Sequence, residues 1–448
     1  MEPSDALHAF RYSLYECLHR RGDALFELTD AILTADAAVP SPVHLSLEAS
    51  HRRGWGSLYA ALDRGRIDAE ALRRLLARHP LAGSQTPVYA VDVSVWPRCD
   101  AEASPERGYY YHPSRHSAGQ PIVAGWAYQF IAQLNFIRES WTAPVDALRV
   151  HPAEDVNTVA AKQVKGLLGR SAMEGAVPLF VFDAGYDPVK LQQGLEDLRA
   201  QILVRLRAGR CFHADPVGPP ALIGRPRRHG PKMKCKDPST WPEPSAEHAC
   251  EDPGYGKVRV RAWSGLHPKV RAHEGRGSRG PLPIVRGTLV LVEVERLPRG
   301  ERRREPRVLW LWWHGSGEVV PDLALLWRAY ARRFDLEHTF RFLKQTLGWT
   351  TPRVRHPEQA DRWTWLVLAA FTQLRLARPW VADRRLPWER RYESGRLTPV
   401  RVRRAVLALL AELGTPAKPP KPCGRSPGRP KGRRSGRAKR YPALKKSA

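Results

Sequence analysis

The stretch VYAVDVSVW, residues 88–96, decides the fold class of this chain. From Val91 to Val95 apolar and polar side chains alternate, which is the period of a β-strand. Further β-rich runs lie at 121–137, 177–185 and 200–206, and stretches with helical spacing lie between them at 155–170 and 187–199. Strands that alternate with helices indicate an α/β domain built on a mixed sheet.

Residues 1–84, upstream of this domain, have helical spacing throughout. Apolar positions recur every three to four residues, and Asp68 is a candidate N-cap for a helix from Ala69 to His79. We therefore expect a helical N-terminal domain. Two interpretations of it stay open: a helix-turn-helix unit that binds DNA ends, or a helical cap packed on the following domain.

The region after the α/β domain begins with a stretch rich in Pro, Gly, Lys and Arg. Strands are expected again at 257–263, 286–296 and 307–313, which indicates a β-rich insertion rather than a linker. Long helices are expected at 321–347 and 358–378. The expected division is a helical domain (1–84), the first part of the core (85–207), the insertion (208–318), core helices (319–382), a C-terminal helical region (383–414) and a basic tail (415–448).

The charge balance of the chain points to a polyanionic partner. Lys and Arg total 73 against 45 Asp and Glu, a formal net charge of +28. The tail carries twelve Lys or Arg and no acid, so we expect it to be disordered when free. No apolar run approaches the ~20 residues of a membrane span, and the six scattered cysteines suit reduced thiols. We expect a cytoplasmic, nucleoid-associated protein without a membrane partner.

Two aspartates occupy strands of the expected sheet. Asp92 lies inside the first strand, where a carboxylate is costly to bury unless it is paired or holds a metal. Asp183 follows the apolar run LFVF, at the edge of the sheet where ligand groups gather in α/β folds. Taken singly, Asp92 is equally compatible with a solvated strand face and Asp183 with a turn.

The most specific pattern lies on the helix expected at 321–347. At 100° per residue, one narrow arc of this helix carries four polar side chains: Tyr330, Arg333, Glu337 and Lys344. An apolar stripe lies about 80° away and consists of Leu336, Phe340, Leu343 and Leu347. Ordinary ion pairs on a helix surface do not explain the tyrosine or the long span to Lys344, so we expect this arc to face a site.

This spacing resembles the Y-R-E-K signature of the DDE transposases of bacterial insertion sequences. The resemblance covers roughly residues 85–380 and implies an RNase H-like catalytic core with a β-rich insertion. It implies a catalytic triad of Asp92, Asp183 and Glu337 that holds two Mg²⁺ ions, with Mn²⁺ as a substitute. It also implies that Tyr330, Arg333 and Lys344 grip DNA phosphates next to the cut.

Two further residues are predicted to contact DNA. Arg341 lies on the same helix as the signature. Trp312, in the run VLWLWWHG, is a candidate platform for a flipped base, as a tryptophan of the insertion is in similar transposases; core packing is the alternative. Strand alternation would place Trp310 and Trp312 on one face and Trp313 on the other.

The resemblance implies a cut-and-paste DNA transposase that acts as a homodimer on double-stranded DNA, namely the terminal inverted repeats and a target. A non-catalytic DNA-binding protein derived from a transposase and a nuclease that cuts without joining remain the alternatives. Two Gly-Arg-Pro stretches, at 224–226 and 428–430, suit a narrow minor groove or generic phosphate contact. A zinc site is a weak candidate because its residues lack a C-x-x-C pair: Cys211, His213, Cys235, His248 and Cys250.

Overall fold

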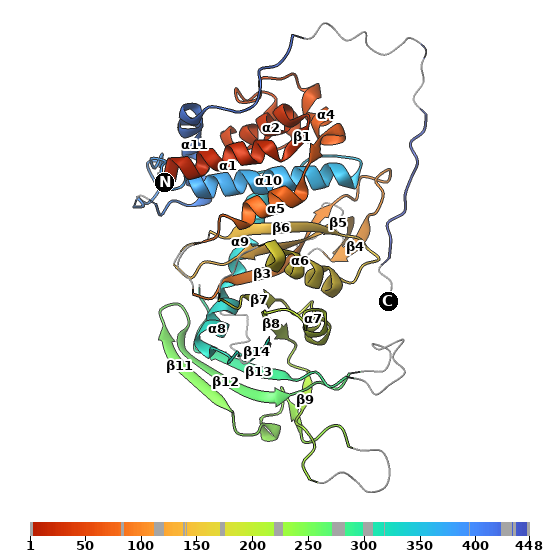
Figure 1. Cartoon of the computed structure of the whole chain (residues 1–448), viewed down its shortest axis with the longest axis vertical. Coiled ribbons are helices and arrows are strands. Elements are labelled where there is room, and N and C mark those ends of the chain that lie inside the picture. Colours follow the sequence, from red (N-terminus) through yellow and green to blue (C-terminus); the bar gives the residue numbers. More distant parts are fainter. Residues whose placement is uncertain are drawn as a thin grey trace.

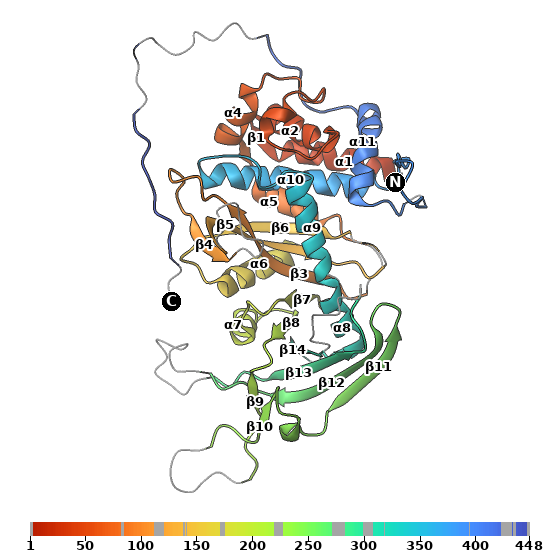
Figure 2. The same cartoon turned by 180° about the vertical axis from the view of Figure 1, so that it is seen from behind.

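The chain folds into a helical layer, a central mixed sheet, and a strongly curved extension of that sheet (Figures 1 and 2). The computed structural model describes residues 3–81, 85–111, 121–137, 139, 141–170, 175–218, 227–270, 283–298, 308–317, 319–393, 395–422, 432 and 436–445. The helical layer lies at the top of Figure 1 and the curved strands at the bottom, so the core sheet is held between them.

The N-terminal helices pack around a long helix from the other end of the chain. They are α1 (Pro3–Glu16), α2 (Gly22–Thr34), α3 (Pro42–Leu45), α4 (Gly56–Arg64) and α5 (Ala69–Ala77), with a two-stranded ribbon of β1 (Leu18–Arg20) and β2 (Arg66–Ile67). Helices α1, α2, α4 and α5 contact α10 (Pro357–Ala377), and α11 (Pro399–Leu413) contacts α2 and α10. This is the packing expected of a helical cap. No described helix is long and apolar enough to cross a membrane.

The core sheet has the strand order of an RNase H-like fold, in agreement with the expected class. Its elements are β3 (Val88–Pro97), β4 (Gly108–Tyr111), β5 (Ile122–Gln133), β6 (Ala143–Val150), α6 (Val156–Arg170), β7 (Leu179–Phe182), α7 (Pro188–Gly194) and β8 (Gln201–Leu206). The strands run β6-β5-β3-β7-β8, with β5 antiparallel and β7 parallel to β3. Short β4 pairs with the start of β5.

The strands that follow continue the same sheet instead of forming a separate one. They are β9 (Cys211–His213), β10 (Lys232–Lys234), β11 (Ala246–Asp252), β12 (Gly256–Leu266), β13 (Gly287–Val294) and β14 (Val308–Gly315), with a 3₁₀ turn at Pro238–Thr240. Strand β14 returns to pair antiparallel with β8, and β13, β12 and β11 follow outward. Only β9 and β10 form a hairpin of their own among the described residues.

The helix expected at 321–347 is divided into two. Helix α8 spans Leu323–Arg332 and α9 spans Phe334–Gln345, with Arg333 at their junction. Arg333 keeps right-handed helical angles (φ −52°, ψ −31°), so the direction of the chain changes little there. The predicted stripe of Leu336, Phe340, Leu343 and Leu347 is buried, which confirms the helical pattern.

The end of the tail has a defined place beside the sheet. The backbone N–H of Tyr441 donates to the carbonyl of Glu102, and that of Leu444 donates to the carbonyl of Arg107. Arg107 in turn donates from its guanidinium to the carbonyl of Tyr441. These residues therefore depart from the expectation of a disordered tail, because backbone pairing along the β4 edge supplies contacts that the charge composition does not reveal.

Gly348, just after α9, allows the chain to turn against the N-terminal block. Its φ is +67°, and an added Cβ would lie 2.6 Å from the carbonyl oxygen of Val39. We expect Gly348→Ala to lower the free energy of unfolding by about 1–3 kcal/mol, measured by chemical denaturation. The control is Gly169→Ala on α6, where nothing lies within 4 Å; it should raise stability by roughly 0.5–1 kcal/mol. Equal effects of the two would contradict this role of Gly348.

Candidate active site

Asp92 lies in the middle of β3, on the face of the sheet that packs against α9. Its neighbours Val88, Ala90 and Trp96 belong to the core on that face, whereas Val91 packs on the opposite side. Only 16% of the Asp92 side chain is exposed. Burial raises the pKa of Asp92 to about 6; the Arg333 cation opposes this rise and the charge of Asp183 adds to it. The two aspartates, 91 positions apart in the sequence, therefore interact.

Arg333 joins the first strand to the helix pair. Its Nη1 donates to Oδ2 of Asp92 at 2.7 Å, and its Nη2 lies 3.5 Å from Oε1 of Glu337. The guanidinium also lies over the ring of Tyr330, with 5.9 Å to the ring centroid. Burial lowers the pKa of Arg333, but the charges of Asp92, Tyr330 and Asp183 and the hydrogen bond to Asp92 together outweigh it, so the net shift is upward. Arg333 is therefore a permanent cation between two of the predicted acids.

Asp183 follows β7 and turns back over its own loop, where its Oδ1 accepts a hydrogen bond from Gly185 N–H at 2.8 Å. Tyr186, which sequence reasoning did not single out, is buried beside both aspartates. Burial raises the pKa of Tyr186 well above its usual value, and the charges of Asp92 and Asp183 raise it further. The sequence feature that could have pointed to Tyr186 is its position three residues after Asp183, in the run DAGYD.

Lys344 lies on α9 near the same acids. Burial lowers its pKa to about 8, and the charge of Asp92 opposes that shift. Its Nζ is 5.7 Å from the centroid of the Trp349 ring. The structure thus brings Tyr330, Arg333, Glu337 and Lys344 to one side of α8 and α9, as their spacing predicted.

Glu337 is close to Arg333 but is not grouped with the two aspartates. Its side chain is 45% exposed and lies beside the Arg333 guanidinium. Across the described ranges no three acidic, histidine or cysteine side chains are close enough to hold a metal ion. Asp92 and Asp183 supply the hard oxygen donors that Mg²⁺ and Mn²⁺ take. Burial, with a contribution from the charge of Asp183, raises the pKa of Asp92, and a bound cation would oppose that rise. The donor chemistry of the two aspartates fits a divalent cation, and Glu337 lies beside Arg333 outside their group.

Two other predicted DNA contacts differ in exposure. Arg341 is exposed on α9. Trp312 is completely buried, and its ring stacks on that of Phe212 with 5.2 Å between centroids. The prediction that Trp312 stacks on a base is wrong for this structure because core side chains cover its ring. Trp310 shares its side of the sheet and Trp313 lies on the other, which confirms the alternation.

The weak zinc prediction finds no support in the part of the chain that is described. Cys211 and Cys235 lie on paired strands β9 and β10, but no three candidate ligands gather there or elsewhere among these residues. His213 instead lies beside His229 and His267, with ring centroids 5.2 and 6.2 Å away. His229 Nδ1 and His267 Nε2 are 3.0 Å apart and share a hydrogen bond.

A family of known proteins matches more than half of this chain. The family described as "DDE superfamily endonuclease" matches residues 13–269, which is more than half of the chain and includes Asp92 and Asp183. No curated protein matches the sequence. A solved structure described as the cryo-EM structure of a piggyBac transposase synaptic complex with hairpin DNA is similar at 9% identity and a TM-score of 0.38. That similarity covers 91% of this chain and 70% of the other.

Proposed function

Since the chain belongs to the DDE superfamily endonucleases, we propose that it is a cut-and-paste DNA transposase. In this proposal it cleaves the ends of a mobile element and joins the freed 3′-hydroxyl to target DNA. Asp92, Asp183 and Glu337 are the proposed catalytic acids. Tyr330, Arg333, Lys344 and Arg341 are the proposed DNA contacts.

One observation carries the proposal: residues from three distant segments meet at one place. Asp92 comes from β3, Asp183 from the end of β7, and Arg333 from the junction of α8 and α9. Arg333 nevertheless bonds Asp92, and the charge of Asp183 raises the pKa of Asp92. A largely buried carboxylate such as Asp92, placed near a second acid, is unfavourable for stability alone. Acids and bases placed together at the edge of a sheet suit phosphoryl transfer.

Enzymes of this family use divalent metal ions, which when bound activate the attacking oxygen and stabilise the leaving oxygen. The chain's own residues supply the remaining requirements. Asp92 and Asp183 provide oxygen donors, and Lys344 and Arg333 provide cations that can hold phosphates beside the cut. Arg333 neutralises Asp92 through their ion pair, so binding of a divalent cation at Asp92 is expected to free Arg333 for the DNA backbone.

The proposed partners are the terminal inverted repeats of the element and a target duplex. We further propose that two copies of the chain act together in the nucleoid, each cutting one end. The strongly basic composition is consistent with duplex DNA as the substrate.

The test uses the purified full chain and a labelled duplex that carries the inverted repeats flanking its gene. We expect cleavage that releases 3′-hydroxyl ends, and joining of those ends to a plasmid, in Mg²⁺ or Mn²⁺. Removing divalent metals with EDTA should abolish both reactions without abolishing DNA binding, because the basic surface remains. Adding Mg²⁺ back should restore them.

The outcomes separate the alternatives. Cleavage without joining would favour the nuclease interpretation. Binding without cleavage in any divalent metal would favour the non-catalytic DNA-binding protein. The observation that favours this alternative is that Glu337 is not grouped with the two aspartates among the described residues. Cleavage that persists in EDTA would contradict the proposed metal-dependent site.

A further inference from the structure

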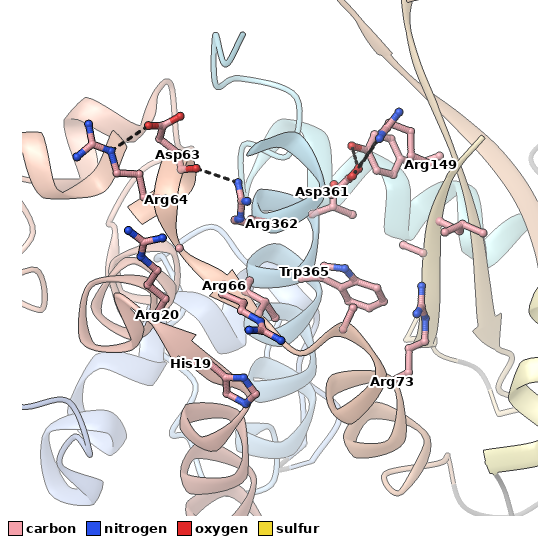
Figure 3. A pocket seen from close by; sticks show the side chains of 17 residues that line it. His19, Arg20, Asp63, Arg64, Arg66, Arg73, Arg149, Asp361, Arg362 and Trp365 are labelled. Carbon is pink, nitrogen blue, oxygen red and sulfur yellow. Dashed lines mark hydrogen bonds and ion pairs between the residues drawn. The ribbon is translucent and has the colours of Figure 1, made fainter. Parts of the chain in front are cut away.

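A hollow with a volume of about 850 Å³ lies between the N-terminal ribbon and the core, and its lining does not include Asp92, Asp183 or Glu337. Ribbon β1–β2 and the end of α4 form one wall, α5 and α10 form another, and β5 and β6 form its floor (Figure 3). Tyr128 on the floor is two residues from Phe130, the cross-strand partner of Asp92. We call this hollow the arginine groove, after its six arginines: Arg20, Arg64, Arg66, Arg73, Arg149 and Arg362.

Two of these arginines have carboxylate partners in close contact. Arg73 pairs with Asp146 at 2.7 Å, and Arg149 pairs with Asp361 at 3.1 Å. Both therefore serve to hold α5 and α10 against β6. Their charges are locally neutralised, so they contribute little to the field in the groove.

The other four leave an excess of positive charge. Arg64 has one loose pair, with Asp63 at 3.4 Å, and both side chains are about half exposed or more. Arg362 donates to the carbonyl oxygens of Leu62 and Asp63 rather than to a carboxylate. Arg20 and Arg66 are exposed and have no hydrogen bond or ion pair among the described residues. Figure 3 shows Arg20, Arg66 and Arg362 around the same hollow.

Two of the arginines that carry this excess positive charge lie on the paired strands of the ribbon. Arg20 and Arg66 are cross-strand partners in the antiparallel β1–β2 pair, next to an irregularity in its register. Like charges placed directly opposite each other destabilise such a pair. Asp63 and Asp68 lie near the ribbon, but in the described part of the chain neither forms an ion pair with Arg20 or Arg66. The ribbon therefore keeps an excess of positive charge that an anionic ligand would offset.

The chemistry of the groove favours a phosphate backbone over a nucleotide or a free base. The aromatic side chains in its described lining are Trp365 and Tyr128, which are both buried, and the exposed imidazole of His19. The guanidinium of Arg73 already covers the Trp365 ring at 5.0 Å, and the Tyr128 hydroxyl is bonded to Asp361. The two large aromatic rings are therefore not free to stack on a base, and His19 is the one exposed aromatic ring of the described lining. Guanidinium groups on two walls can instead contact successive phosphates.

We propose that the arginine groove binds the phosphodiester backbone of duplex DNA independently of base sequence. Arg20, Arg66 and Arg362 make the contacts, and Arg64 adds to the field. This inference rests on the proposed function in one respect: that function is the reason for choosing DNA as the polyanion that the groove binds. It assigns the ribbon and α10 a positioning role away from the cleavage chemistry.

The test compares Arg20→Gln/Arg66→Gln with wild type by fluorescence anisotropy on a labelled duplex of arbitrary sequence. Loss of two phosphate contacts should reduce the slope of log K against log salt by about two and weaken binding on the order of 10- to 100-fold at ~0.1 M salt. The control is Arg199→Gln/Arg390→Gln, which removes the same charge at exposed arginines outside the groove. The control should bind nearly as tightly as wild type.

A charge reversal separates binding from folding. Arg66→Glu places an acid opposite Arg20, so the thermal midpoint should stay the same or rise while DNA binding falls. A lower midpoint would show that the arginines are structural and would overturn the proposal. Equal losses for groove and control variants would also overturn it, as would a larger loss with duplex RNA than with DNA. Cleavage by the wild-type protein, measured in parallel, tests the proposed function separately. If binding depends on the groove arginines but no cleavage occurs, the groove proposal stands and the proposed function fails. If cleavage occurs but DNA binding does not depend on the groove arginines, the groove proposal fails.

Discussion

Asp183→Asn is expected to lower the rate of DNA cleavage by about a thousandfold or more, with little change in DNA affinity. Asparagine keeps an oxygen that can accept the hydrogen bond from Gly185, so the loop after β7 should retain its conformation. It removes the negative charge that interacts with Asp92. A carboxylate that supports metal-assisted phosphoryl transfer contributes several kcal/mol to the barrier, and each 1.36 kcal/mol is tenfold in rate.

The measurement is single-turnover cleavage of DNA that is already bound, in Mg²⁺. Asp197→Asn is the matched control, because Asp197 is an exposed aspartate of the same region whose side chain forms no hydrogen bond or ion pair among the described residues. It should cleave at the wild-type rate. If Asp183→Asn cleaves within tenfold of wild type while still binding DNA, Asp183 is not a catalytic acid of this chain.

Arg11→Met is expected to lower the free energy of unfolding by about 3–5 kcal/mol, the largest stability effect that the structure indicates. Arg11 is 1% exposed and donates to both carboxylate oxygens of Asp30, at 2.7 and 2.9 Å. It also donates to Gln373 on α10 and to the carbonyl of Gly414 after α11. Its loss leaves Asp30 buried without a cation and removes a link between the two ends of the chain.

Equilibrium denaturation monitored by tryptophan fluorescence measures this effect. Arg74→Met is the control, because Arg74 is about half exposed and its pair with Glu70 is 4.0 Å long; its effect should stay below about 1 kcal/mol. Arg11→Met/Asp30→Leu should recover much of the loss, since it removes the uncompensated charge. A cost below about 1 kcal/mol for Arg11→Met alone would show that the buried pair is dispensable.

Local patterns in the sequence predicted the elements that carry the site. Asp68 caps α5 through hydrogen bonds from Glu70 and Ala71 N–H, as its position indicated. The alternation in residues 88–96 became β3, and the spacing of Tyr330, Arg333, Glu337 and Lys344 became one side of α8 and α9. These features depend on periods of two and 3.6 residues, which a short window of sequence contains.

Features that join distant segments were not predictable in this way. The Arg20–Arg66 pairing joins residues 46 positions apart, and Tyr186 gains its significance only from aspartates on two different strands. The return of β14 to β8 likewise joins the expected insertion to the core sheet. Trp312 is a residue for which the sequence suggested a contact that the fold prevents. Its aromatic ring suggested stacking on a DNA base, whereas the fold buries the ring completely.

The sequence by itself determined the class of fold, the order of its elements and the residues that one helix presents together. The tertiary structure decided which of those residues meet, which are covered, and which charges remain without partners. The physical reason is that periodicity and capping are set by neighbours along the chain, whereas burial and the pairing of charges depend on how the whole core packs. Arg333 therefore could be placed beside Glu337 from spacing alone, but its bond to Asp92 required the folded sheet.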